Sequence, residues 1–393
     1  MSSSARSGSG TAARGPGLSR DPSQADAVRQ IVRDTMGEQH LKAVIVRVSV
    51  NGKNVLTEAF GESVTGVPAS TKMHFRNGAV AISYMSTLLL QLVDDKKVSL
   101  DDKVSKWLPN VPNSDQVTLG QLAQMTSGYA DYVQNPDFID AVFADPFREF
   151  TPEELIAYGT PESLLYEPGT NWNYSHTDYV ILGLALEKIT RTKMTTLMRD
   201  KVLRPLGLTS TADTGTPAIP EPALHAFTSE RREALEIPAG IPFYEESTDW
   251  NPSWTLARGA IQTTTIDDMH DTAVGIGAGK LLSRKSYEKM VSTQLRGKTT
   301  ALPGCSTCFE QSEEYTYGLG VIIAGDWLTQ APSFGGYAGA EAYLPSKKIA
   351  IAVAATHDQA YFEDPNLPSN AADALFRNIA AQIAPNDAPP AST

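Results

Sequence analysis

Residues 75–93 read FRNGAVAISYMSTLLLQLV, and the rest of the chain can be placed around this stretch. An aromatic-Arg-x-Gly entry runs directly into an apolar segment long enough for about four helical turns. A helix that is apolar all round is expected to be buried. Its first turn carries Ala79 and Ile82, which lie one helical turn apart on the same face. We expect this helix start to form the floor of a pocket whose walls come from two later stretches.

The composition is that of an ordinary globular protein. The 393 residues are 41% hydrophobic and 20% charged, which is enough for one large domain or two interleaved ones. A net charge of -12 and a pI near 5.0 argue against a nucleic-acid-binding surface. The sequence has no run of about 18 apolar residues, so no transmembrane helix is predicted.

Both ends of the chain are predicted to be loose. Residues 1–22 are rich in Ser, Gly, Ala and Arg and lack the apolar core of a signal peptide. The sequence as it stands predicts a cytoplasmic protein; an exported protein whose leader has been removed is the alternative. Residues 386–393 form a Pro/Ala-rich tail.

Periodicity and turn signals predict a mixed α/β fold of the α+β type. Asn51-Gly52 is a strong hairpin signal between two strand patterns. The predicted order is a helix at 23–38, strands at 43–50 and 54–60, a mostly helical region at 79–215, a long irregular loop at 216–255, a helix at 266–276, strands at 317–323, 337–344 and 348–354, and a closing helix at 371–383. We therefore predict one domain over 23–385, with an α/β part at 23–78 and 256–385. Its five-stranded antiparallel sheet would be flanked by the terminal helices, with the helical region inserted.

Four motifs follow one another along this layout. They are the 75–78 entry with its helix, Met125-Thr126-Ser127-Gly128, the 166–179 segment YEPGTNWNYSHTDY, and Phe334-Gly335-Gly336 with the Tyr-Ala-Gly after it. In this order they resemble the motifs of the serine β-lactamase and penicillin-binding-protein family, nearest to the class C β-lactamase, DD-carboxypeptidase and esterase branch. The resemblance covers residues 25–385 and implies a β-lactamase-like fold without a cofactor.

The resemblance also implies a reaction. In the family, a Ser at the first turn of a helix attacks a carbonyl, and a Lys three residues on helps to deprotonate it. A Tyr relays protons, a Lys or His on the last strand orients the substrate, and backbone N–H groups form the oxyanion hole.

The matching positions here carry other residues. Ala79 stands at the nucleophile and Ile82 at the base lysine, and Phe334 replaces the His or Lys. Tyr174 is kept, but His176 replaces the Asn of that motif. Alanine has no lone pair for a carbonyl and isoleucine cannot move a proton, so the acyl-serine reaction is predicted to be lost.

A different serine nucleophile is the less favoured alternative. Ser83 and Ser86 lie in the same helix, but no Lys follows either of them by three residues. A Ser-x-x-Lys does occur at Ser286–Lys289, after the Tyr motif and without the apolar helix. An exposed polar helix start is its simpler interpretation, and Ser346-Lys347 is interpreted as an exposed strand turn.

Tyr174 and His176 are the candidate catalytic residues, because a phenol and an imidazole two residues apart can exchange protons with a ligand. A buried tyrosine and a structural histidine are the simpler alternatives for these two residues.

Asp131 and Glu341 are the nearest candidate carboxylates, although such a residue is more often a charge exposed to solvent. The residues predicted to line the cleft are Ser127, Gly335, Gly336, Tyr337, Gly339 and Glu341; Gly336 and Gly339 either admit a ligand carbonyl or permit a strand bend.

Cys305 and Cys308 form a Cys-x-x-Cys motif in a loop. Two ligands cannot complete a zinc site, and a thioredoxin-like role needs a strand-to-helix context that is absent. We predict that the two cysteines form either a disulfide that closes this loop or a pair of free thiols, and that they bind no metal.

Two function classes follow. The favoured hypothesis is a non-catalytic protein that binds a small molecule or a cell-wall-like ligand. Ala79, Ile82 and Phe334 would make the floor of the cleft dry and favour an apolar or aromatic ligand. The alternative is an esterase or amidase that uses Tyr174 and His176 with activated water. A weaker third hypothesis is a partner-binding scaffold that uses the 216–255 loop and its two tryptophans.

Overall fold

The computed structural model describes residues 23–160 and 163–391. The predicted disordered segment 1–22 lies outside the described residues. Within the described ranges, no helix is both long and apolar enough to cross a membrane.

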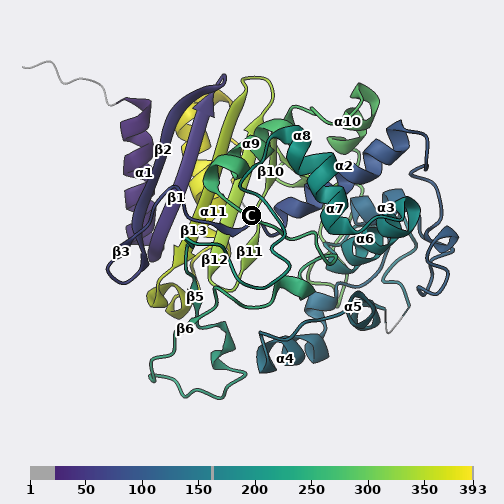
Figure 1. Cartoon of the computed structure of the whole chain (residues 1–393), viewed down its shortest axis with the longest axis horizontal. Coiled ribbons are helices and arrows are strands. Elements are labelled where there is room, and N and C mark those ends of the chain that lie inside the picture. Colours follow the sequence, from purple (N-terminus) through teal and green to yellow (C-terminus); the bar gives the residue numbers. More distant parts are fainter. Residues whose placement is uncertain (1–22, 161–162, 392–393) are drawn as a thin grey trace, which may run out of the picture.

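A nine-stranded antiparallel sheet forms one side of the molecule (Figure 1). The order of the main path is β3-β2-β1-β13-β12-β10-β9-β8, and β11 pairs with β12. Its strands are β1 Leu41–Val50, β2 Lys53–Val64, β3 Val67–Pro68, β8 Thr316–Tyr317, β9 Ile322–Ala324, β10 Trp327–Gln330, β11 Ser333–Phe334, β12 Tyr337–Leu344 and β13 Ile349–His357. The antiparallel α+β arrangement is confirmed, whereas the count of five strands is wrong. The short strands β3, β10 and β11 carry too few residues to show a period of two. The strand predicted at 317–323 is interrupted at 318–321, so β8 and β9 are separate strands.

The predicted hairpin is present. Asn51 and Gly52 both have positive φ, 50° and 74°, as a turn that matches the twist of the strands requires. The hairpin then pairs with the end of the chain, because β1 is bonded to β13 in the register Val46↔Val353.

The two faces of the sheet have different coverings. Helices α1 (Gln24–Glu38) and α11 (Ala371–Ile383) cover one face together, as predicted, over Val44, Val46 and Val48 of β1. The opposite face packs against α9 (Ile266–Gly277) and the helical region. Alternation along β12 places Ala338, Ala340 and Ala342 under α1 and α11 and the odd-numbered residues on the other face.

Helix α2 (Val80–Asp94) is the centre of the helical region, and every residue from Val80 to Leu90 is buried. Helix α6 (His176–Thr190) packs beside it and begins after Ser175, whose Oγ accepts from the Asp178 N–H. The other helices are α3 Leu119–Gln124, α4 Pro136–Ala144, α5 Pro152–Gly159, α7 Met194–Met198, α8 Arg204–Leu206 and α10 Arg284–Met290.

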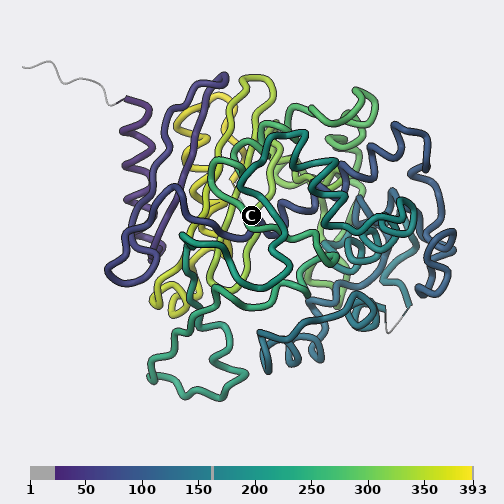
Figure 2. Tube along the Cα trace, viewed as in Figure 1, coloured from purple at the N-terminus to yellow at the C-terminus, as the bar shows by residue number. Residues whose placement is uncertain are grey.

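The 216–255 segment includes the small antiparallel pair β5 (Phe227–Thr228) and β6 (Glu245–Glu246), and the loop between these strands extends from the lower edge of the molecule in Figure 2. The C-terminal end of this segment is fixed to the helical region, because the Asn251 N–H donates to Pro146 O at 2.8 Å.

The described part of the C-terminal tail also makes contacts: Trp327 Nε1 donates to Asp387 O at 2.7 Å. The tail predicted to be loose therefore contacts β10 at Asp387.

Candidate functional site

A cavity of about 670 Å³ opens where the helical region meets the sheet. Its floor comes from the start of α2, and one wall comes from the start of α6. The other walls come from α4, from residues 250–256 and from residues 330–335. Most of the lining side chains are aromatic or aliphatic, as is usual for a small-molecule site.

The floor is fixed by the close approach of the Pro332 ring to Gly78. Gly78 has φ +49°, and a Cβ at this position would lie 2.6 Å from Cβ of Pro332. Asn77 is bonded in both directions to Gln262, through its N–H at 3.0 Å and its Oδ1 at 2.9 Å. Ala79 follows without a side-chain cap, and both Ala79 and Ile82 line the cavity. The first turn of α2 therefore presents two hydrocarbon side chains to the space above it.

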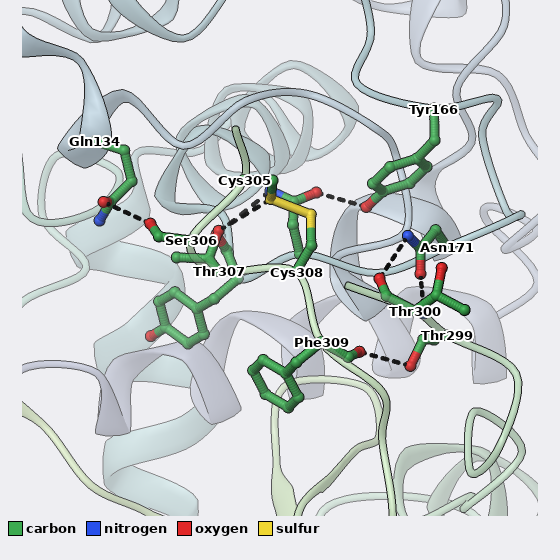
Figure 3. Close-up of a disulfide and its surroundings, with 12 residues drawn as sticks. Gln134, Tyr166, Asn171, Thr299, Thr300, Cys305, Ser306, Thr307, Cys308 and Phe309 are labelled. Atoms are coloured by element: carbon green, nitrogen blue, oxygen red, sulfur yellow. Dashed lines mark hydrogen bonds between the residues drawn. A yellow bond between two sulfur atoms is a disulfide. The ribbon is translucent and has the colours of Figure 1, made fainter. Parts of the chain in front are cut away.

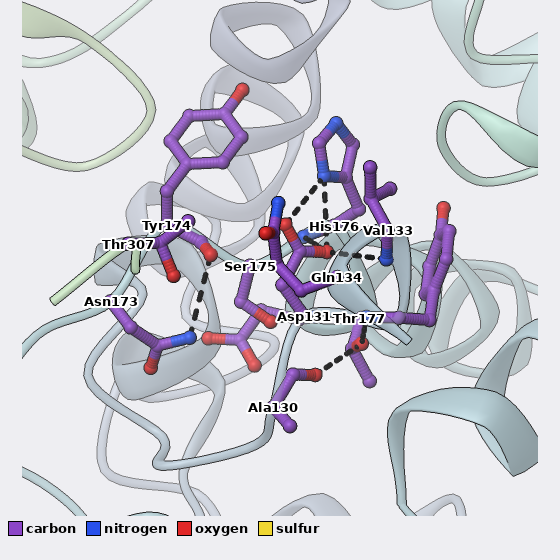
Figure 4. A network of polar contacts seen from close by, with 12 residues as sticks. Ala130, Asp131, Val133, Gln134, Asn173, Tyr174, Ser175, His176, Thr177 and Thr307 are labelled. Atoms are coloured by element: carbon purple, nitrogen blue, oxygen red, sulfur yellow. Dashed lines mark hydrogen bonds and ion pairs between the residues drawn. The ribbon is translucent and has the colours of Figure 1, made fainter. Parts of the chain in front are cut away.

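Tyr174 and His176 form the wall at the start of α6, with ring centroids 5.2 Å apart (Figure 4). Nδ1 of His176 lies 3.1 Å from both carboxylate oxygens of Asp131, and the His176 N–H donates to Asp131 Oδ1 at 3.1 Å. A carboxylate only accepts, so Nδ1 carries the proton and Nε2 of a neutral ring is left as an acceptor. The structure thus brings together three of the predicted candidates, with Asp131 buried behind the imidazole.

Burial raises the pKa of Tyr174 well above its usual value, and the neighbouring Tyr315 and Asp131 act in the same direction. Its phenol is therefore neutral at pH 7 and offers a proton rather than accepting one. Among the described residues, no side chain is hydrogen-bonded to this hydroxyl.

Phe334 and Trp254 form the opposite wall. Their rings are stacked with centroids 5.5 Å apart and planes 26° apart. The guanidinium of Arg76 lies 6.0 Å from the Phe334 ring centroid, and its Nη2 donates to the carbonyls of Pro217, Thr248 and Trp250. Burial lowers the pKa of Arg76, and these carbonyls compensate the buried charge. The cation thereby holds the 216–255 segment over the cavity.

The predicted cleft lining is only partly realised. Gly335 lines the cavity, whereas the other five residues of that prediction do not: Ser127, Gly336, Tyr337, Gly339 and Glu341. The Ser127 hydroxyl is buried and donates to Asp178 Oδ1 at 2.6 Å, and the Tyr337 hydroxyl donates to Leu224 O at 2.5 Å. A Cβ at Gly336 would meet Phe227 O at 2.1 Å, and one at Gly339 would meet Pro332 Cγ at 2.9 Å. Both glycines are needed because protein, rather than a ligand, approaches them closely.

Glu341 lies in the core rather than in the cleft. The period of β12 puts it on the same face as Gly339 and Tyr343, and this face packs against α9. Its Oε2 is buried without a hydrogen-bond partner in the described structure. Burial raises the pKa of Glu341 to about 8, so the carboxyl is mostly protonated at neutral pH.

The Cys305–Cys308 disulfide is formed, and its loop supports the wall at the start of α6 (Figure 3). Thr307 O accepts from the Tyr174 N–H at 3.4 Å, and the Ser306 Oγ donates to Gln134 at 2.9 Å. The Phe309 ring packs edge-on against Trp172 at 4.9 Å. The loop closed by this disulfide therefore supports the wall of the candidate site.

The alternative serines lie away from the cavity. Ser83 Oγ donates to Val80 O at 2.8 Å, and Ser86 Oγ is 2.7 Å from the Tyr179 hydroxyl; both serines are buried. Ser286 is buried rather than exposed, and its Oγ donates to Asp94 Oδ1 at 2.6 Å. None of the three lines the cavity.

Several lining residues were not predicted from the sequence as part of the pocket. They include Phe138 and Val142 of α4, Glu230, Trp250, Trp254 and Tyr315. The Trp250-Asn-Pro-Ser-Trp254 cluster carried a signal, because two tryptophans in an irregular loop need an apolar surface to cover. Phe138 and Glu230 had no such signal, since their place depends on how α4 and the 216–255 segment pack.

Comparison with known proteins agrees with this architecture. Residues 28–376 match the Beta-lactamase family, so the chain belongs to the β-lactamase family. The relatives are penicillin-binding-protein-like. The chain is 26% identical over 295 residues to the putative penicillin-binding protein PbpX of Bacillus subtilis (strain 168), covering 72% of this chain and 61% of that protein. It is 31% identical over 186 residues to penicillin-binding protein 4 of Amycolatopsis lactamdurans, covering 44% of each. The chain thus spans less than two thirds of these relatives.

Solved structures with a similar fold include amide hydrolases. The D-amino acid amidase from Ochrobactrum anthropi SV3 complexed with L-phenylalanine amide has a TM-score of 0.74 at 20% identity, covering 92% of this chain and 99% of that one. A D-stereospecific amidohydrolase from Streptomyces has a TM-score of 0.71 at 21% identity, covering 87% and 98%. At these identities the likeness concerns the fold.

Proposed function

We propose that this protein is a β-lactamase-fold homologue without acyl-serine chemistry, which binds an apolar or aromatic small molecule in the cavity above α2. The observation that supports the proposal is the floor: Ala79 and Ile82, which the motif resemblance aligns with the family's Ser and Lys, both line the cavity. Ser83, Ser86 and Ser286 are bonded elsewhere and do not line the cavity. Ser333 does line it, but it lies in strand β11 rather than at the first turn of a helix.

The walls support an aromatic ligand. Trp254 and Phe334 offer stacked rings on one side and Tyr174 offers an edge on the other, and such surfaces favour planar apolar groups. The amidase of similar fold is described in complex with L-phenylalanine amide, an aromatic compound, and we extend this class of ligand to the present chain.

Filling the cavity from its floor tests the proposal. In Ala79→Phe, the added ring takes the place of the ligand, and we expect at least tenfold weaker binding of the neutral probe 4-phenylbutan-1-ol. Trp250 and Trp254 line the cavity, so their fluorescence reports binding. Ala381→Phe, on the exposed side of α11, is the matched control and should bind like the wild type. Equal binding by Ala79→Phe would overturn the proposal, and so would a covalent adduct of a fluorescent penicillin with a cavity residue.

The His176–Asp131 pair favours a second candidate, a hydrolase that uses activated water. Asp131 orients the imidazole and leaves Nε2 free to accept a proton from water. The neutral phenol of Tyr174 lies close enough to assist a leaving group.

Turnover of 4-nitrophenyl butyrate separates the two candidates. If the protein is a hydrolase, His176→Ala abolishes turnover, and Asp131→Asn lowers kcat by about 10²–10⁴-fold because it removes the acceptor that orients the ring. The Asn variant should also shift the pH profile, which a merely structural role would not do. If the protein is a binder, the wild type and both variants hydrolyse the ester at the same background rate.

A further inference from the structure

The charge on the cavity wall is uneven. Glu230 is the single carboxylate among the residues that line the cavity, and it comes from the 216–255 segment. Among the described residues, no Lys, Arg or His forms an ion pair with it. Glu230 is an exposed residue, so a positive charge that enters the cavity from solvent can pair with its carboxylate.

The neighbouring cations already have partners. Arg231 donates to Phe143 O at 2.7 Å and pairs with Glu245 at 3.0 Å, which ties this segment to the end of α4. Arg76 donates to three backbone carbonyls on the side of the cavity that carries Phe334. Both cations hold the walls together, and neither neutralises Glu230.

Aromatic rings share this cavity with the carboxylate. Phe138 and Phe143 of α4 line it together with Trp250 and Trp254. The faces of such rings attract an alkylammonium group, and a carboxylate beside them adds direct attraction. A neutral ligand gains no such attraction, and an anionic ligand is repelled by the carboxylate.

We infer that the ligand of this cavity is an amphipathic amine, with an aromatic or apolar body and a primary ammonium group that pairs with Glu230. This inference rests on the proposed binding function and names the ligand class for the same cavity. The positive charge of Arg76 confines the ammonium group to the Glu230 side and leaves the Trp254–Phe334 side to the apolar body.

Three probes of the same length test the inference: 4-phenylbutylamine, 4-phenylbutan-1-ol and 4-phenylbutyrate. At low salt we expect the wild type to bind the amine 5- to 20-fold more tightly than the alcohol and the carboxylate least tightly. Glu230→Gln keeps the shape of the side chain and should abolish the preference for the amine. Glu230→Lys should reverse it in favour of the carboxylate. Glu233→Gln is the control and should behave like the wild type, because Glu233 lies three positions further on the same segment, is also exposed and does not line the cavity.

The outcomes separate the two proposals. If the wild type binds the alcohol as tightly as the amine, and Glu230→Gln binds both unchanged, the ammonium inference is wrong while the binding function stands. If none of the three probes gives a saturable fluorescence change, the binding function fails, and the inference fails with it. A preference for the amine that survives both Glu230 substitutions would assign the ammonium group to another residue and overturn the inference.

Discussion

The Glu341→Gln variant is expected to resist unfolding better than the wild type at pH 9, by an amount on the order of 3–5 kcal/mol. The pKa of Glu341 is raised by burial from its ordinary value of 4.5 to about 8. Between these two values the folded state holds a proton that the unfolded state has released. The free energy of unfolding of the wild type therefore falls as the pH rises from about 4.5 to about 8. A glutamine is neutral throughout and lacks this loss.

Urea midpoints at pH 5, 7 and 9 measure the effect. At pH 5 the two proteins should differ little, and the gap should widen until about pH 8 and then stay constant. Glu313→Gln is the control, because Glu313 is exposed and should follow the wild type at every pH. Parallel pH curves for the wild type and Glu341→Gln would show that the carboxyl is not held neutral in the core.

The Gly336→Ala variant is expected to lose about 3–5 kcal/mol of stability and to disturb the cavity. Gly336 has φ +80°, which costs alanine about 1 kcal/mol or more by itself. The larger part comes from packing, because a Cβ would lie 2.1 Å from O, 2.8 Å from C and 3.2 Å from N of Phe227. These are backbone atoms of β5 and cannot rotate away, so the 216–255 segment must move.

Gly240→Ala isolates the contribution of packing. Gly240 has φ +85° in the same segment, but a Cβ there meets nothing within 4 Å. We expect this control to lose only about 1 kcal/mol in a denaturant titration and to bind the neutral probe normally. If Gly336→Ala were no less stable than Gly240→Ala, β5 would not be fixed against the sheet as described.

The sequence predicted the parts of the fold that repeat a pattern over many residues. Helices α1, α2, α6, α9 and α11 and strands β1, β12 and β13 have long apolar periods, and each is found where it was predicted. The sheet was predicted too small because β10 and the shorter strands are held by their neighbours rather than by a pattern of their own.

In the candidate site, too, the residues that belong to a motif could be predicted and the others could not. Ala79, Ile82, Tyr174, His176 and Phe334 were placed by motif, and all of them line the cavity. Glu341 was misplaced because counting along a motif does not reveal which face of β12 packs against α9. The carboxylate that does line the cavity, Glu230, lies in a segment without periodicity, and only packing determines where its side chain goes.

The pairing of β1 with β13 also has a consequence for how the chain is made. About 300 residues lie between the end of β1 at Val50 and the start of β13 at Ile349. At 5–20 residues per second, a ribosome needs about 15–60 s to supply the second strand after the first has been synthesised. During that time the β1–β2 hairpin has an unpaired edge rich in valine, which is a template for wrong pairing. We therefore expect the nascent hairpin to need protection by a chaperone during synthesis.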